Sequence, residues 1–405
     1  MLDNSLKSVL DEEKISQALR DNSASKLKNS KRLYAIGDHC DIRKGHSRKL
    51  ENIGKVRDLN GNITNGYSTL GTVILDEEKK DITLADITVF SNKEDRFVTQ
   101  KELKQYEKNK IEDKSRVEEL KKIIDSKEHI NMTISVREQT QRVSKAIKAQ
   151  NPKASICHVH DRFCDSVGYF EHIDQTLKDE FVVRVKLSRN SNQTKMDEKS
   201  KKKAVKLIDA KYENKKEYIL EKLRLKGKIY QQAKVILEWD KVTLNNNEYN
   251  VVKITLKKRD GEAIHKKPML LISNIKIESY IQAKEIYHIY LLRTKIESVF
   301  KFLKDVLGWE EFQVRDWNSI KNIIALCFFI GNYFYEIESA LIDNPTIEII
   351  CQMGNGKDKV TRYFFLEGLK VLLIAQKAFR LKKELEISDE TWQEMQSFAG
   401  IAGGG

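Results

Sequence analysis

The sequence predicts a mixed α/β fold in which helices flank a central sheet. Apolar runs with strand character alternate with longer segments that are rich in Lys, Glu and Gln and have the composition of helices. Pro152 ends the longest of these helical segments. The expected elements, in order, are strands at 33–37, 67–75 and 82–90, helices within 97–150, and then a strand, a helix and a strand at 155–160, 166–178 and 181–185.

Two aspartates stand at the ends of expected strands. Asp38 follows the first apolar run, and Asp161 follows the run at 155–160. Asp41 is the alternative to Asp38, but the apolar run already ends at Asp38. The polar residues 76–81 form a turn, so the second and third strands are expected to pair antiparallel. Three strands, a helix, a strand, a helix and a strand, with aspartates after the first and fourth strands, is the plan of a ribonuclease H-like domain.

A change of composition after residue 189 predicts an insertion into this domain. Residues 195–228 carry 13 Lys or Arg against 6 Asp or Glu, and three strand-like runs follow before residue 275. From Tyr280 onward the chain has helical character. The expected organisation is an N-terminal helical segment at 1–31, a ribonuclease H-like core in two parts at 32–189 and 276–340, a β-rich insertion with a basic arm at 190–275, and a helical region at 341–405.

The charge balance indicates a polyanionic partner. The net charge is +13 and the isoelectric point is near 9.2, which favours nucleic acid over a membrane surface. No run approaches the roughly 18 uninterrupted apolar residues of a membrane span, and the start lacks the pattern of a signal peptide. The five cysteines show no C-x-x-C spacing, so we expect reduced thiols in a cytoplasmic protein.

Residues 290–304 have the periodicity of one amphipathic helix. At about 100° per residue, four polar residues fall on one stripe with Lys301 at its edge, and apolar residues fill the opposite side. Spacing alone also fits a surface helix with ordinary Glu–Lys and Glu–Arg pairs. The residues of the stripe are Tyr290, Arg293, Glu297 and Lys304.

This stripe resembles the Y-R-E-K signature of DDE transposases of bacterial insertion-sequence family four. Residues 160–165 resemble the segment around the second catalytic aspartate of that family, commonly written D-R-x-x-D. Residues 180–184 resemble its next strand, which ends on a DNA-contacting arginine, here Arg184. Residues 307–315 resemble the segment downstream of the catalytic glutamate. The resemblance covers residues 33–340 and agrees with the ribonuclease H-like plan.

By this resemblance Asp38, Asp161 and Glu297 are the catalytic D-D-E triad. They would hold two Mg²⁺ ions, for which Mn²⁺ can substitute, in an enzyme that cuts DNA at transposon ends and joins it to a target. Without metal, three clustered carboxylates should repel one another and raise at least one pKa. The side chains that would contact DNA phosphates are Tyr290, Arg293, Lys304, Arg184, Lys301 and Arg162.

The resemblance also implies double-stranded DNA as partner, a homodimer on paired transposon ends, and a place at the bacterial nucleoid, with no membrane. Two departures stand out. Met269 occupies the position where members that cut through a hairpin carry a base-stacking tryptophan, and only 37 residues precede Asp38. Members of that family usually carry a larger helical end-binding domain there, so residues 1–31 are expected to be a truncated DNA-binding region, in a chain that is either a fragment or naturally shortened. Two alternatives share the same residues: a catalytically silent DNA-binding remnant of a transposase, and a metal-dependent DNA nuclease of the same fold.

Overall fold

The computed structural model describes residues 11–58, 60–126, 128–196, 202–225, 228–340, 344–355 and 360–398. The chain forms two compact units, one up to Asn332 and one from Tyr333 onward. Parts of four expected segments lie outside the described residues: 1–10 of the N-terminal segment, 59 and 127 of the core, 197–201 and 226–227 of the basic arm, and several stretches of the C-terminal region.

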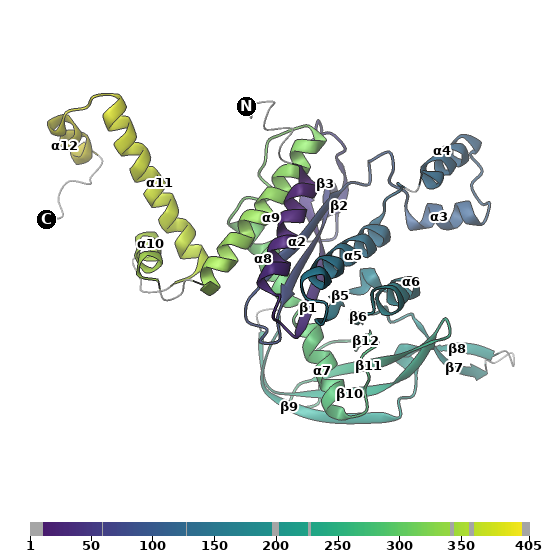
Figure 1. Cartoon of the computed structure of the whole chain (residues 1–405). Coiled ribbons are helices and arrows are strands. Elements are labelled where there is room, and N and C mark those ends of the chain that lie inside the picture. Colours follow the sequence, from purple (N-terminus) through teal and green to yellow (C-terminus); the bar gives the residue numbers. More distant parts are fainter. Residues whose placement is uncertain are drawn as a thin grey trace. The chain divides into compact units, whose positions relative to one another are not determined.

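The first unit is built on a mixed sheet with ten described strands (Figure 1). In one half, β1 pairs antiparallel with β3 and parallel with β5, and β5 pairs parallel with β6. Beyond β3, the short β2 and the longer β4 pair with opposite ends of that strand. Without β2 the order is β4-β3-β1-β5-β6, which is a ribonuclease H-like sheet and confirms the predicted fold class. The strands are β1 (Arg32–Arg43), β2 (Gly54–Arg57), β3 (Ile63–Leu75), β4 (Thr83–Phe90), β5 (Ser155–His160) and β6 (Glu180–Arg184).

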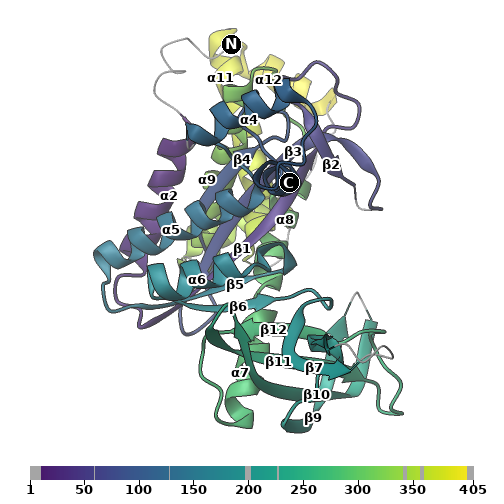
Figure 2. The same cartoon turned by 90° about the vertical axis from the view of Figure 1, so that its right-hand side faces the viewer.

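Helices cover both faces of this half of the sheet. On one face, α2 (Glu12–Lys26) and α5 (Met132–Gln150) lie side by side and pack on alternate residues of β1, such as Leu33 and Ala35 (Figure 2). On the other face, α8 (Thr294–Asp305) and the first part of α9 (Trp317–Ala340) approach β3 closely. A Cβ on Gly71 of β3 would lie 2.9 Å from Phe300 and 3.2 Å from Phe328.

The connections carry the remaining helices of this half. Between β4 and α5 lie α3 (Gln100–Glu107) and α4 (Lys114–Asp125). Between β5 and β6, α6 (Val167–Glu171) continues as a π-helix (His172–Leu177) that ends on Lys178 in the left-handed conformation. The expected helix at 166–178 is therefore present, with a widened final turn.

The β-rich segment continues the central sheet. β12 pairs antiparallel with β6, and β11, β10 and β9 follow outward in that order. Because Val, Ile and Leu alternate with polar residues along β10 and β11, one face of these strands is buried. The strands are longer and more numerous than the sequence indicates: β7 (Asn190–Met196), β8 (Lys202–Lys206), β9 (Asn214–Leu225), β10 (Lys228–Leu244), β11 (Asn247–Lys257) and β12 (Met269–Ser273).

One helix in the described part of the chain has the length and hydropathy of a membrane span, namely α9 over Trp317–Ile337. Half of this segment is buried. Ile324 and Phe328 are both fully buried within the first unit.

The second unit is helical. It contains the last residues of α9, then α10 (Pro345–Asn355), α11 (Arg362–Glu384) and α12 (Asp389–Phe398). The backbones of α10 and α11 touch at two glycines. A Cβ on Gly368 would lie only 1.7 Å from the Ile350 carbonyl oxygen, so no larger residue fits there without moving a helix.

Candidate active site

Asp38 lies within β1, beside the carboxyl end of β5. The prediction that the first strand ends at Asp38 is wrong, because β3 continues to pair with β1 as far as Arg43. The partner that ends is β5: its pairing with β1 extends to Ile36 opposite Val159. Asp38 lies two residues beyond Ile36, and Asp161 lies two residues beyond Val159. The register therefore brings the two aspartates to the same edge of the parallel pair.

The Asp38 carboxylate is largely buried and faces α8. Its Oδ2 accepts a hydrogen bond from Arg293 Nη1 at 2.5 Å, and its Oδ1 accepts one from the His39 amide at 2.9 Å. Burial raises the pKa of Asp38 to about 6, against the lowering effect of Arg293, and the charges of Asp161 and Glu297 raise it further. A raised pKa is expected for clustered carboxylates, although burial contributes more to it than their repulsion does.

Asp161 occupies the N-cap position of a short 3₁₀ turn (Arg162–Cys164) directly after β5, and its side chain makes no capping hydrogen bond. Three donors surround its Oδ1: the Tyr290 hydroxyl at 3.3 Å, Arg184 Nη1 at 3.7 Å and Arg162 Nε at 3.9 Å. Burial and the Asp161 charge raise the pKa of Tyr290, so its phenol is protonated and can donate. Three predicted DNA-binding residues, Tyr290, Arg184 and Arg162, are thus gathered around one predicted catalytic carboxylate.

Residues 290–304 are not one helix, and this corrects the predicted stripe. Tyr290 lies in α7 (Tyr280–Leu291), whereas Glu297 and Lys304 lie in α8. Between the helices the backbone bonds tighten to i→i+3, from the Arg293 amide to the Tyr290 carbonyl at 3.1 Å and from the Lys295 amide to the Leu292 carbonyl at 2.9 Å. This turn separates Tyr290, which contacts Asp161, from Glu297 on the next helix.

Arg293 stands in this turn and bridges two of the predicted catalytic carboxylates. Its Nη1 binds Asp38, and its Nη2 donates to Glu297 Oε1. The Arg293 side chain is 18% exposed, and that of Glu297 is 51% exposed. Burial lowers the pKa of Arg293, but Asp38, Tyr290, Glu297 and Asp161 together raise it by more, so Arg293 stays fully charged. Arg293 is therefore the present counter-charge of the acidic cluster.

The carboxylates suit a hard divalent cation in kind, because Mg²⁺ prefers oxygen ligands and keeps several of its waters. They are close enough for Asp161 and Glu297 to raise the pKa of Asp38. Among the described residues, however, no three acidic, His or Cys side chains converge on one point as metal ligands do. The three carboxylates are therefore the right kind of ligand for such a cation. Arg293 lies between Asp38 and Glu297, which would have to come closer together to bind one ion.

Asp41, the alternative to Asp38, points to the other face of β1, as strand alternation requires. Its carboxylate accepts hydrogen bonds from Ser68 Oγ and from the Arg57 amide, both at 3.2 Å. The geometry favours Asp38 as the member of the cluster.

Lys304 and Lys301 differ in their surroundings. Lys301 is exposed. Lys304 Nζ donates to the Asp41 carbonyl at 2.5 Å and to Glu310 Oε1 at 3.0 Å. Glu310 is a residue of this region that the sequence did not single out. A lone glutamate six residues beyond Lys304 carries no recognisable pattern, and only its contacts identify it.

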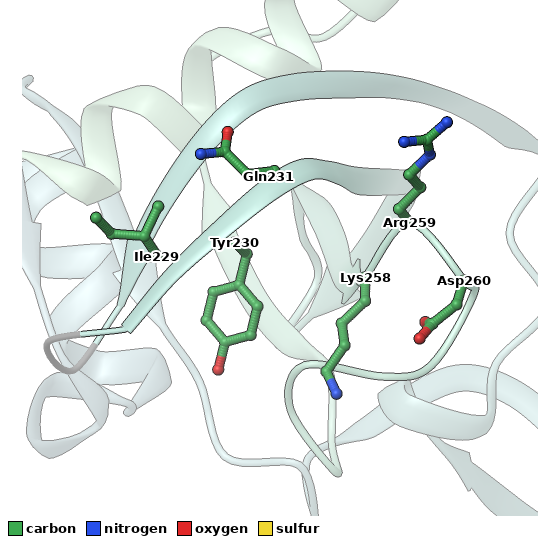
Figure 3. A pocket seen from close by; sticks show the side chains of 6 residues that line it. All are labelled: Ile229, Tyr230, Gln231, Lys258, Arg259 and Asp260. Carbon is green, nitrogen blue, oxygen red and sulfur yellow. The ribbon is translucent and has the colours of Figure 1, made fainter.

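A second cationic surface lies at the far end of β9, β10 and β11. Six exposed cations gather there and, within the described ranges, form no ion pair with another side chain. Beside them a hollow of about 560 Å³ is lined by Tyr230 and Lys258, which extend to the same side of the strands, while Arg259 extends to the other (Figure 3). This cationic tip consists of Lys222, Arg224, Lys228, Arg259, Lys266 and Lys267.

The ribonuclease H-like sheet and the acidic cluster beside β1 and β5 define a domain of the kind that processes nucleic acids. Comparison with protein families is more specific. The model of the family described as transposase DDE domain matches residues 78–333, more than half of the 405-residue chain. The chain therefore belongs to the transposase DDE domain family.

The matched stretch includes Asp161, Arg184, Tyr290 and Glu297 but begins after Asp38. The assignment of Asp38 thus depends on its position beside Asp161 in the sheet. A search of curated proteins found no match.

Proposed function

We propose that this chain is a cut-and-paste DDE transposase of the insertion-sequence family four type, in which Asp38, Asp161 and Glu297 are the catalytic triad. The main support is the register of β1 against β5, which brings Asp38 and Asp161 together on the sheet face that α8 and Glu297 cover. In the proposed reaction, water cleaves the phosphodiester at the transposon end, and the freed 3′-hydroxyl then attacks DNA.

The three carboxylates are proposed to hold two Mg²⁺ ions, with Mn²⁺ as a substitute. Such ions activate the attacking oxygen and stabilise the leaving one. The protein's own contribution is rigidity: a strand holds Asp38, the 3₁₀ turn that directly follows β5 holds Asp161, and Val299 and Phe300 anchor α8 in the core. A fixed backbone limits the positions that each carboxylate can adopt around the ions.

The cations around the triad are proposed to bind the phosphates next to the cut. Arg184, Arg162 and the Tyr290 hydroxyl all face the Asp161 side of the cluster, where a phosphate would meet three donors. Arg293 is proposed to contact a phosphate as well, by exchanging its carboxylate partners for the DNA. Lys301 is exposed on α8, and it is proposed to contact the same DNA strand as Arg293 does.

The cationic tip is proposed as a further contact with double-stranded DNA, away from the triad. Its cations are exposed and can reach successive phosphates, and Tyr230 adds an aromatic surface. Binding of transposon ends and target by a homodimer in the bacterial cytoplasm, at the nucleoid, completes the proposal. A hairpin step is not part of the proposal, because Met269 begins β12 and offers no aromatic face on which a base could stack.

The direct test is to incubate the full chain with Mg²⁺ or Mn²⁺ and labelled duplex DNA, in parallel with Glu297→Gln. Cation-dependent nicking by the wild type, lost in the variant, together with joined products, supports the transposase. Nicking without joined products would indicate a nuclease of the same fold instead. Nicking that persists in Glu297→Gln would remove Glu297 from the triad.

A second candidate function is a catalytically silent DNA-binding protein. It is favoured by one observation: Arg293 lies between Asp38 and Glu297, and the described residues contain no converged metal-ligand group. If wild type and Glu297→Gln both bind DNA and neither nicks it with either cation, this second function is correct.

A further inference from the structure

Glu310 is the centre of an ion-pair network beside the proposed triad. Its Oε1 accepts hydrogen bonds from the Arg43 amide at 2.9 Å and from Arg43 Nε at 3.1 Å, and its Oε2 accepts one from Arg43 Nη2 at 3.0 Å. Lys304 Nζ donates to the same Oε1 at 3.0 Å. One carboxylate therefore binds two cations from two different elements, Arg43 at the end of β1 and Lys304 near the end of α8.

The backbone around Glu310 is held firmly. Gly308 has a φ of +63°, which permits a tight turn directly after α8. The Trp309 amide then donates to the Leu303 carbonyl at 3.0 Å, and its indole Nε1 donates to the Ile324 carbonyl at 3.0 Å. Trp309 is fully buried and stacks on Phe300. Because Trp309 is anchored, the backbone of Glu310 is fixed next to Arg43 and Lys304.

The network joins the two elements that carry Asp38 and Glu297. Lys304 lies seven residues after Glu297, two turns along the same face of α8. It also donates to the Asp41 carbonyl of β1 at 2.5 Å. Strand and helix are therefore fastened to each other on one side of the acidic cluster, through groups that include neither Asp38 nor Glu297.

A second link between these elements uses the carboxylates themselves. Arg293 connects β1 to α8 by binding Asp38 and Glu297 directly. A cation bound by the same two carboxylates would compete with Arg293, so the Arg293 bridge cannot set their spacing in that state. The Glu310 network does not compete, because all its acceptors lie elsewhere.

We propose that Glu310 is a positioning residue that, through Lys304 and Arg43, holds α8 against β1 at the spacing Asp38 and Glu297 need to bind a divalent cation together. This inference rests on the proposed function. It gives Lys304 a role inside the protein in addition to the phosphate contact that the sequence predicts. The lowered pKa of Glu310, to which burial is opposed and Arg43 and Lys304 contribute, agrees with a permanently ionised centre.

The test measures two quantities on the full chain: the affinity for Mn²⁺ from an electron paramagnetic resonance titration, and the unfolding temperature in EDTA. Glu310→Gln keeps the shape and removes the charge. Glu238→Gln is the matched control, since Glu238 pairs with Lys253 at 3.3 Å with a similar side-chain exposure, 22% against 20% for Glu310. We expect Mn²⁺ affinity to fall about tenfold in Glu310→Gln, as for other residues that orient metal ligands. The control should bind Mn²⁺ like the wild type.

Lys304 supplies a second, independent pair of variants. Lys304→Met removes the link and should weaken Mn²⁺ binding as Glu310→Gln does, whereas Lys304→Arg can still donate to Glu310 and Asp41 and should restore most of the affinity. A merely structural role would lower the unfolding temperature of Lys304→Met and leave its Mn²⁺ affinity unchanged.

The outcomes separate the two proposals. If Asp38→Asn abolishes Mn²⁺ binding but Glu310→Gln binds like the wild type, the positioning role is wrong and the triad stands. If the wild type has no Mn²⁺ site that depends on Asp38, the proposed function fails and the positioning role fails with it.

Discussion

Asp38→Asn should make the cation-free protein more stable at neutral pH, and the gain should depend on pH. Burial raises the pKa of Asp38 from 3.8 to about 6, so the folded state holds this proton more tightly than the unfolded state. The stability that this proton contributes is present below pH 4 and is lost as the pH rises through 6. The difference of 6 − 3.8 = 2.2 pKa units corresponds to about 3 kcal/mol in full.

About 1 kcal/mol of this cost has already developed at pH 4.5, so about 2 kcal/mol should develop between pH 4.5 and 7.5. The assay is urea unfolding of wild type and Asp38→Asn in EDTA across this range. The free energy of unfolding of the variant minus that of the wild type should rise with pH by that amount. Taking the difference cancels other groups, including Glu12, whose pKa burial also raises, to about 7. Asp81→Asn, on the exposed turn before β4, is the control and should give a flat difference. A difference that falls with pH would mean that the pairing with Arg293 outweighs burial, and the reasoning would be refuted.

Three further predictions follow from individual contacts. Arg293→Met should lower the free energy of unfolding in EDTA by about 2 kcal/mol at pH 7.5, because it leaves Asp38 without its counter-charge. Saturating Mn²⁺ should reduce this loss. An equal loss with and without Mn²⁺ would argue against a site that Arg293 and the cation share. The double variant Lys228→Gln/Arg259→Gln should reduce the slope of log affinity against log salt for duplex DNA by about 2, measured by fluorescence anisotropy. The control variant Lys104→Gln/Lys108→Gln, on the α3 side, should leave the slope unchanged. Equal slopes in both variants would show that the cationic tip does not contact DNA. Trp309→Ala should lower the free energy of unfolding by about 3–5 kcal/mol, since it empties a fully buried site and removes the hydrogen bond to the Ile324 carbonyl. A loss under about 1 kcal/mol in urea unfolding would show that Trp309 does not anchor the turn before Glu310.

The fold could be predicted from the sequence where local pattern and topology agree. The apolar runs at β3, β4, β5 and β6 are bounded by turn residues, and their order is compatible with few sheets. Asp161 could be placed for the same reason, because β5 ends directly before it. In contrast, β1 continues past Asp38 only because β3 offers it a partner as far as Arg43, and such a pairing leaves no trace in the periodicity of either strand.

The site was harder to predict where its geometry depends on contacts between distant residues. The turn between α7 and α8 contains no Gly or Pro, so the periodicity runs through it without interruption. Arg293 and Lys304 each bind a group on β1, the Asp38 carboxylate and the Asp41 carbonyl, which lie 255 and 263 residues earlier in the chain. The sequence pattern of a basic residue near acidic ones is the same whether its side chain binds DNA or another part of the protein. Only the distances between that side chain and its neighbours in the structure distinguish the two.

The measurement that tests the triad most directly is an anomalous-scattering map of crystals grown with Mn²⁺. We expect Mn²⁺ between Asp38 and Asp161, with Glu297 turned toward it and Arg293 released from both of its carboxylate partners. Mn²⁺ bound only elsewhere, with Arg293 still bridging Asp38 and Glu297, would contradict the proposed active site.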